Sequence, residues 1–146
     1  MNAPADPNFA VRIRASFGRQ KAMALIGASL TVVEPGRVEV ALPYRDDLTQ
    51  QKGFIHGGII GMIADTACGY AAYSLMPAGC SLVTVEYKMN ILTPARSSLL
   101  ARGHVVKPGR TLTIARAEVY ADDGKHVATM QQQTLMMLPD RPDAPE

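Results

Sequence analysis

A histidine and two glycines stand directly before the most apolar segment of the chain. His56, Gly57 and Gly58 follow a polar stretch that contains Gln50. Paired glycines let the backbone approach a ligand closely, and the first turn of a helix has N–H groups without intrahelical acceptors. Such donors at the positive end of a helix stabilise the negative charge that develops on an attacked carbonyl oxygen. The motif fits an oxyanion hole and, equally, a tight turn into the helix in which His56 packs or hydrogen-bonds locally.

Asp65 is the only acidic residue between Ile55 and Met76. An isolated carboxylate in apolar surroundings costs several kcal/mol, so we expect it to be paired, hydrogen-bonded or exposed in a cleft. In a cleft, Asp65 would act as a general base for water or attack as a nucleophile. The alternative is a structural hydrogen bond across the helix or to a strand.

The spacing between Gly57 and Asp65 predicts a site that two chains share. Eight residues separate them, which is about 12 Å along a straight helix. One chain therefore cannot easily bring both groups to one reacting carbonyl. If two copies pack these helices antiparallel, Gly57 of one copy approaches Asp65 of the other, and a dimer holds two equivalent sites.

The elements that carry these residues predict an α+β fold. Apolar residues recur among Arg and Lys from about Phe9 to Ile26, which predicts one amphipathic helix ending near Gly27. The segment from Ser29 to Pro43 predicts a hairpin that turns at residues 34–36. The segment from Ile55 to Met76 is apolar on nearly every side, so a helix there must be wrapped by protein.

After Pro77 the pattern changes to strands. Residues 82–92 alternate, which predicts a buried face made of Val83, Val85, Tyr87, Met89 and Ile91. Further strands are expected at residues 99–106, 112–121 and 127–138, with turns at 107–110 and 122–125. An antiparallel sheet beside one wholly apolar helix is expected to curl around that helix. The long strands leave an edge or face that another copy of the chain would cover.

Size and composition narrow the function class. The chain has 146 residues, 47% of them hydrophobic, which suits a single domain at 9–138, with disordered tails expected at 1–8 and 139–146. A net charge of +2 argues against nucleic acid as a partner. No apolar run is long enough to cross a membrane, so a soluble cytoplasmic protein is expected. Cys68 and Cys80 lack zinc-site spacing, and neither a metal nor a cofactor is expected.

Several motifs together resemble the PaaI-type acyl-CoA thioesterases of the hotdog superfamily. The resemblance extends from about Leu30 to Leu138. The motifs are Gln50-x-x-Gly53-x-x-His56-Gly57-Gly58, Ala64-Asp65-Thr66-Ala67, Val83-Thr84-Val85 and Thr93-Pro94-Ala95. The resemblance implies a hotdog fold, a curved antiparallel sheet wrapped around a long central helix. It also implies hydrolysis of a small aryl- or short- to medium-chain acyl-CoA by a homodimer or homotetramer.

The resemblance further implies roles for five residues. Asp65 matches the acidic nucleophile or general base, and Gly57 matches the residue whose N–H polarises the thioester carbonyl. Gln50 falls where an amide orients substrate or water, and its replacement of the commoner Asn leaves aromatic and aliphatic acyl groups both open. His56 matches a histidine that shapes the site through hydrogen bonding. Thr84 falls where some relatives position the hydrolytic water.

The remaining candidates would hold the substrate. Lys and Arg near turns can pair with the phosphates of CoA, and an exposed strand can bind its amide arm. The CoA candidates are Gly58, Lys88, Asn90, Lys107, Arg110 and Lys125. The candidates for the acyl pocket are Met62, Tyr70, Tyr73, Leu75, Met76 and Met89, residue types that also serve as plain core. His104 and His126 have no assigned partner.

Three other hypotheses about the function compete with that of a thioesterase. A hotdog module could bind acyl-CoA without cleaving it, although Asp65 argues against that. A hotdog dehydratase would rely on a histidine and an acid in a different motif. A purely structural subunit leaves the acid behind the glycine turn without a purpose.

Overall fold

The computed structural model describes residues 3–138 as one α+β domain. Its helices are α1 (Phe9–Gly18), α2 (Lys21–Ile26) and α3 (Gly57–Tyr73), with a short 3-10 turn η1 (Asp46–Leu48). Its strands are β1 (Ser29–Glu34), β2 (Arg37–Leu42), β3 (Ser81–Ile91), β4 (Leu99–Lys107), β5 (Leu112–Ala121) and β6 (His126–Met137). None of the helices between residues 3 and 138 is long and apolar enough to span a bilayer.

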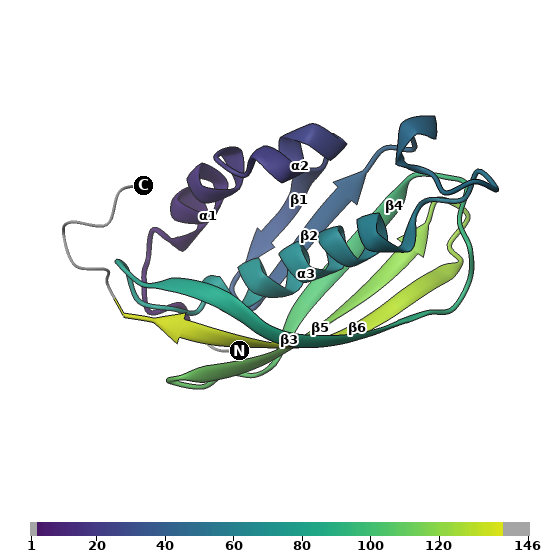
Figure 1. Ribbon diagram of the computed structural model, residues 1–146. Coiled ribbons are helices and arrows are strands. Elements are labelled where there is room, and N and C mark those ends of the chain that lie inside the picture. Colours follow the sequence, from purple (N-terminus) through teal and green to yellow (C-terminus); the bar gives the residue numbers. More distant parts are fainter. Residues whose placement is uncertain (1–2, 139–146) are drawn as a thin grey trace.

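The six strands form one antiparallel sheet that curves around α3 (Figure 1). The strand order is β1-β2-β4-β5-β6-β3, so β1 and β3 are the edges. The predicted hairpin turns at Gly36, whose φ of 74° lies in the left-handed region that glycine favours. The predicted α+β architecture and its order of elements are confirmed.

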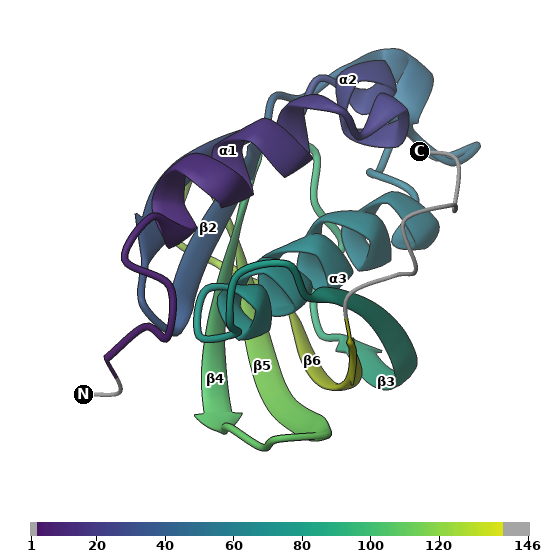
Figure 2. The same ribbon diagram turned by 90° about the vertical axis from the view of Figure 1, so that its left-hand side faces the viewer.

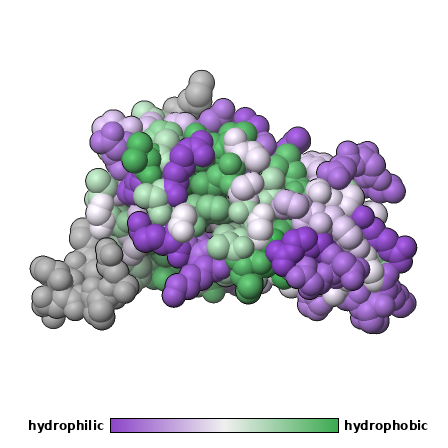
Figure 3. Space-filling model, turned by 90° about the horizontal axis from the view of Figure 1, so that it is seen from above, coloured by the Kyte–Doolittle hydropathy of each residue, from purple (hydrophilic) through white to green (hydrophobic). Residues whose placement is uncertain are grey.

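Most of helix α3 is buried, as its apolar sequence predicts. Ile63, Ala64 and Ala67 have no exposed surface. The helix lies so close to β4 that a Cβ atom at Gly103 would sit 2.3 Å from the carbonyl oxygen of Ala67. On the side away from β5 and β6, α1 and α2 lie over α3 (Figure 2). The face that carries α1 and α2 mixes apolar and polar residues (Figure 3).

The prediction of one continuous N-terminal helix is wrong. Helix α1 ends at Gly18, and Gln20 has an extended backbone, with φ −75° and ψ 98°, before α2 begins. Glycine is a poor helix former, so the chain can turn here at little cost. Helix α2 then ends at Ile26, and the next residue, Gly27, has φ 75°, so the predicted helix end near Gly27 is confirmed.

Arg12 links α1 to the C-terminal end of α3 by hydrogen bonds. Its Nη2 donates to the carbonyl oxygens of Tyr73 and Met76 at 3.3 and 2.9 Å, and its guanidinium lies 4.1 Å from the centre of the Tyr73 ring. Asp6, which falls in the expected N-terminal tail, is buried and pairs with Arg12 Nε at 2.9 Å. The expected tails at residues 1–2 and 139–146 lie outside the described residues.

The side of β3 that was predicted to face the core is correct from Tyr87 onward but wrong at Val83 and Val85, because a bulge breaks the alternation. The pairing register with β6 shifts between Thr84 and Glu86. Directly opposite residues point to the same side of a sheet. Tyr87 is opposite the buried Gln132, and Thr84 is opposite the buried Thr134, so both point toward α3. The extra residue thus moves Thr84 to the inner face, and Val83 and Val85 are 48% and 56% exposed.

Candidate active site

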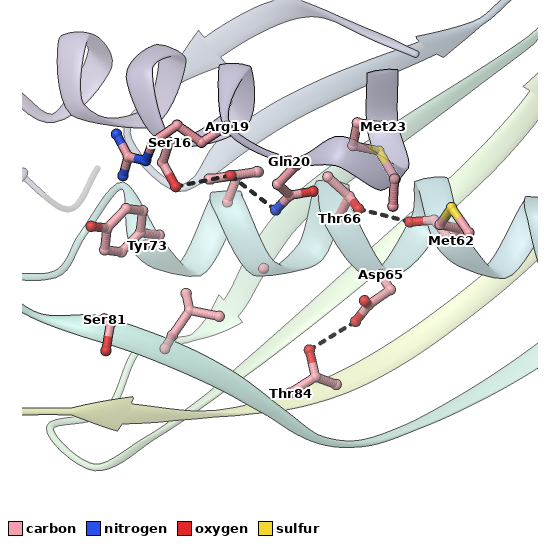
Figure 4. A pocket seen from close by; sticks show the side chains of 14 residues that line it. Ser16, Arg19, Gln20, Met23, Met62, Asp65, Thr66, Tyr73, Ser81 and Thr84 are labelled. Carbon is pink, nitrogen blue, oxygen red and sulfur yellow. Dashed lines mark hydrogen bonds between the residues drawn. The ribbon is translucent and has the colours of Figure 1, made fainter. Parts of the chain in front are cut away.

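Asp65 projects from α3 toward the inner face of β3 and β6 (Figure 4). Thr84 Oγ1 donates a hydrogen bond to Asp65 Oδ1 at 2.8 Å. Gln132 Nε2 donates to the same oxygen, and also to the Asp65 carbonyl at 3.2 Å. Among residues 3–138, Asp65 Oδ2 has no hydrogen-bond partner. The carboxyl group is thus held on one oxygen only.

Burial changes the acidity of this carboxyl. Removal from water raises the pKa of Asp65 above its ordinary value, and the hydrogen bonds from Thr84 and Gln132 offset the rise in part. A raised pKa brings a carboxylate closer to the range in which it accepts a proton from water in a reaction near neutral pH. The predicted cleft position of Asp65 is therefore accompanied by a pKa shift in the direction that favours a general base.

A pocket of about 480 Å³ opens beside Asp65. It lies between α3, the α1–α2 segment and the start of β3. From Asp65 it runs past Gly69 to Tyr73, a distance of about 12 Å along α3. The walls mix apolar side chains, such as Met62 and Leu82, with polar ones. A small acyl group would fit in such a space.

One wall of the pocket carries a hydrogen-bonded group from the N-terminal helices. Ser16 Oγ lies 3.1 Å from the Tyr70 hydroxyl, and Gln20 Nε2 donates to that hydroxyl at 3.0 Å. Tyr70 is 5% exposed, and burial raises the pKa of its hydroxyl. The break between α1 and α2 is what brings Gln20 into this wall.

The glycine turn forms the N-terminus of α3, as predicted. His56 precedes the helix, and its Nδ1 accepts a hydrogen bond from the Gly58 N–H at 2.9 Å. The Ile59 and Ile60 N–H groups both donate to the His56 carbonyl. Within the described chain, the Gly57 N–H has no acceptor. This turn therefore offers one free backbone donor, the Gly57 N–H. His56 stabilises the turn through its hydrogen bond with the Gly58 N–H.

Gln50 lies in a tight turn ahead of this helix. Its Oε1 accepts a hydrogen bond from the Lys52 N–H, and its carbonyl accepts one from the Gly53 N–H at 2.9 Å. The Gln50 side-chain oxygen is thus engaged within the turn. The chain itself does not bring Gln50 to Asp65, since Gln50 is not among the residues that line the pocket.

One chain keeps Gly57 and Asp65 apart. Both belong to α3, with eight residues between them, or about 12 Å along its axis. Gly57 instead lies beside the end of β3, where an added Cβ would be 2.8 Å from Ile91 Cδ1. The sequence-based expectation that one copy cannot join these groups agrees with this arrangement.

The candidate CoA residues do not gather in one place. Lys88 and Asn90 are opposite Gln131 and Thr129 of β6, so they point away from α3 and line a groove on the outer face of the sheet with Arg116. Lys107 and Arg110 lie at one end of β5, and Lys125, which pairs with Asp123 at 3.0 Å, lies at the other. The two ends are about 30 Å apart.

The candidate acyl-pocket residues are divided as well. Met62, Tyr70 and Tyr73 line the pocket beside Asp65. Met76 packs with Ala72 and Cys80 in a separate apolar cluster, which is the plain-core alternative.

Three residues were not predicted from the sequence: two in the pocket wall, Ser16 and Gln20, and one that contacts Asp65, Gln132. Ser16 and Gln20 were missed because the predicted continuous helix gave no reason to turn them inward. Gln132 was missed although a signal existed. It is the middle of three consecutive glutamines in a predicted strand, and alternation turns the middle one to the opposite face from its neighbours.

Neither cysteine offers a reactive thiol. Both are free and buried. Burial raises the pKa of Cys68, and the Asp65 carboxylate raises it further. Among the residues that the structure describes, no three His, Cys, Asp or Glu side chains gather in a way that could hold a metal ion.

Comparison with known proteins assigns this architecture. The model of the thioesterase superfamily matches residues 52–128. A thioesterase family protein from Silicibacter pomeroyi is 47% identical, with a TM-score of 0.86 over 89% of this chain and 98% of the other. The PaaI protein of E. coli, from the phenylacetic acid degradation operon, is 19% identical and shares the fold, with a TM-score of 0.84 over 91% and 96%. The chain therefore belongs to the thioesterase superfamily and has its hotdog fold.

Proposed function

We propose that the protein hydrolyses a small aryl- or short- to medium-chain acyl-CoA to the free acid and CoA. The observation that carries the proposal is a carboxyl group of raised pKa, Asp65, at the side of a pocket large enough for a small acyl group. Family membership supports the thioester as the bond that is cleaved. The E. coli PaaI protein comes from the phenylacetic acid degradation operon, which supports an aryl group among the candidates.

Asp65 could promote hydrolysis of the thioester to the free carboxylic acid by two routes. As a base, its carboxylate takes a proton from water while the water oxygen attacks the thioester carbon, and the CoA thiolate leaves and is protonated. As a nucleophile, the carboxylate oxygen attacks the carbon itself, the thiolate leaves, and water then hydrolyses the mixed anhydride. In both routes negative charge develops on the thioester oxygen, so a donor near that oxygen is needed.

The Gly57 N–H of a second copy is the proposed donor. Asp65 adjoins Thr84 on β3, and Gly57 adjoins Ile91 on the same strand. If two β3 strands pair antiparallel about an axis between Tyr87 and Lys88, Thr84 of one copy lies opposite Ile91 of the other. This register brings Asp65 toward Gly57 of the partner subunit at two equivalent places.

The exposed edge of the sheet favours that pairing. β3 is an edge strand, and an unpaired strand edge is a template for adding another strand. Its large apolar side chains are exposed, with Val85 at 56%, Tyr87 at 47% and Ile91 at 49%. Pairing would cover these side chains and extend the sheet through both copies. The homodimer is therefore part of the proposed active site, and a tetramer would be a pair of such dimers.

The first experiment asks whether the chain cleaves thioesters at all. The purified protein is incubated with a panel of acyl-CoAs that have aryl, short and medium acyl groups, and release of free thiol is followed. We expect turnover of the smaller members, and a loss of about a thousandfold or more in Asp65→Asn, because the amide neither accepts a proton nor attacks.

Circular dichroism and size measurements on Asp65→Asn serve as the control for folding. Tight binding of acyl-CoA without release of thiol would reject hydrolysis and favour a binding module. Equal turnover by wild type and a folded Asp65→Asn would also contradict the proposal.

A further inference from the structure

Gln132 makes contacts that the proposed reaction has not yet used. Its side chain comes from the middle of β6 and reaches the α3 backbone and carboxyl group of the same residue, Asp65. It has no exposed surface and does not line the pocket. The side-chain hydrogen bonds of Gln132 that bear on the reaction are therefore those to Asp65.

Both hydrogen bonds to the Asp65 carboxyl reach one oxygen. Thr84 and Gln132 approach Oδ1 from neighbouring strands, β3 and β6, and the second bond of Gln132 Nε2 is to the Asp65 carbonyl. Donors on two strands fix the direction of the carboxyl plane more firmly than either donor alone. The oxygen without a partner is Oδ2.

The other end of the Gln132 amide is unpaired. Gln132 Oε1 is a buried side-chain oxygen without a hydrogen-bond partner in the described chain. A buried acceptor in that state costs free energy, so the amide is not there for stability alone. Residues kept at a cost of this kind are expected at functional sites.

We propose that Gln132 is a positioning residue that, together with Thr84, holds Asp65 Oδ1 and thereby leaves Oδ2 as the oxygen that reacts. The proposal rests on the proposed hydrolase function of Asp65. It also gives Thr84 a contact with the carboxylate itself, in addition to the water-positioning role implied by the resemblance.

The proposal predicts a change in acidity as well as in rate. A donor to a carboxylate favours the charged form, so its removal raises the pKa of that carboxyl. The reaction needs the ionised form, so the acid limb of the rate profile moves to higher pH. The shift expected from losing one hydrogen bond to a charged group is about one pH unit. Because Gln132 does not line the pocket, kcat falls, by about tenfold, while KM changes little.

The test variant is Gln132→Met, which keeps a similar shape and removes both amide groups. Its matched control is Gln131→Met, the same substitution on the same strand, where the side chain is exposed on the outer face. Two quantities are measured: the pH dependence of kcat/KM, and the pKa of Asp65 from a carbon-13 NMR titration of its carboxyl group. The NMR titration requires no turnover, so it separates this proposal from the proposed function.

We expect Gln132→Met to raise the Asp65 pKa and to shift the acid limb upward, because the charged carboxylate loses one of its two donors. Gln131→Met should leave the limb in place. An unchanged limb and an unchanged NMR pKa, with a lowered melting temperature, would assign Gln132 a merely structural role and overturn the proposal. If Gln132→Met does not fold, Thr84→Val removes the other donor from an exposed strand and must raise the same pKa.

Discussion

The surroundings of Asp65 favour its reactivity and lower the stability of the folded protein when the carboxyl is charged. Burial raises its pKa, which means that the folded protein resists the charged form. Hydrogen bonds from Thr84 and Gln132 compensate only in part. A carboxylate that is partly removed from water binds a proton more readily, because its charged form is less well solvated.

The raised pKa of Asp65 predicts that Asp65→Asn stabilises the folded protein at neutral and alkaline pH. Because the folded-state pKa is raised, the neutral carboxyl contributes stability that is fully present below the unfolded value, about 3.9. That contribution is lost as the pH rises through the folded-state pKa. Asparagine stays neutral throughout, so the melting temperature of Asp65→Asn should exceed that of wild type at pH 8 and approach it near pH 4.

The comparison is made by thermal melts at one protein concentration. Asp47→Asn is the control of opposite sign, since a hydrogen bond from Arg45 lowers the pKa of the exposed Asp47 carboxyl. It should give no stabilisation at pH 8. A melting temperature for Asp65→Asn at or below that of wild type at pH 8 would contradict the raised pKa.

At the scale of elements, the N-terminal helices complete the pocket without belonging to the sheet. Arg12 connects α1 to the end of α3 through three carbonyl oxygens, those of Tyr73, Met76 and Pro77. A cation near the last turn of a helix is also favoured by the helix dipole. Since α1 and the residues after it provide Ser16 and Gln20, the geometry of the pocket depends on this attachment.

We therefore expect Arg12→Ala to loosen α1. The loss of its hydrogen bonds and of the pair with Asp6 should cost about 2 kcal/mol of unfolding free energy, since the side chain is largely buried. Proteolysis in the α1–α2 region should become faster, and KM for the preferred acyl-CoA should rise. Arg14→Ala, on the exposed side of the same helix, should change none of these quantities. Equal proteolysis rates for the two variants would be evidence against the attachment.

The elements also show what the sequence could and could not predict. The pattern of apolar residues correctly predicted α3, the hairpin and the later strands, because in each of them the pattern extends over many residues. It failed at two single-residue events: the turn at Gln20 and the bulge after Thr84. Both depend on contacts with distant residues, such as the Tyr70 hydroxyl and the β6 register, and local pattern does not contain these. Among the candidate site residues, Asp65 and Gly57 were predicted from the sequence, whereas Gln20 was not, because its position depends on the break after α1.

At the scale of the whole molecule, the proposed mechanism makes a single copy contribute one half to each of two sites. Asp65 and its pocket lie toward the middle and C-terminal half of α3, and the free Gly57 N–H lies at its N-terminus. The exposed apolar edge of β3 offers a way to join the halves of two copies. The central claim of the proposed mechanism is this joining.

Complementation between two inactive variants tests that claim most directly. Gly57→Pro removes the N–H while keeping the helix start, because proline is well tolerated at the first helical position and His56 already has an extended backbone. Gly57→Ala is its control, since it adds a Cβ beside Ile91 but keeps the N–H. The measurement is the turnover of a co-expressed mixture of Gly57→Pro and Asp65→Asn.

If the site is shared, each mixed dimer contains one site with both Asp65 and the Gly57 N–H intact. Random mixing should then restore about a quarter of wild-type turnover, although each variant alone is inactive. Gly57→Ala should retain more activity than Gly57→Pro. A mixture of folded, mixed dimers that stays as inactive as its components would contradict a site built from two copies of the chain.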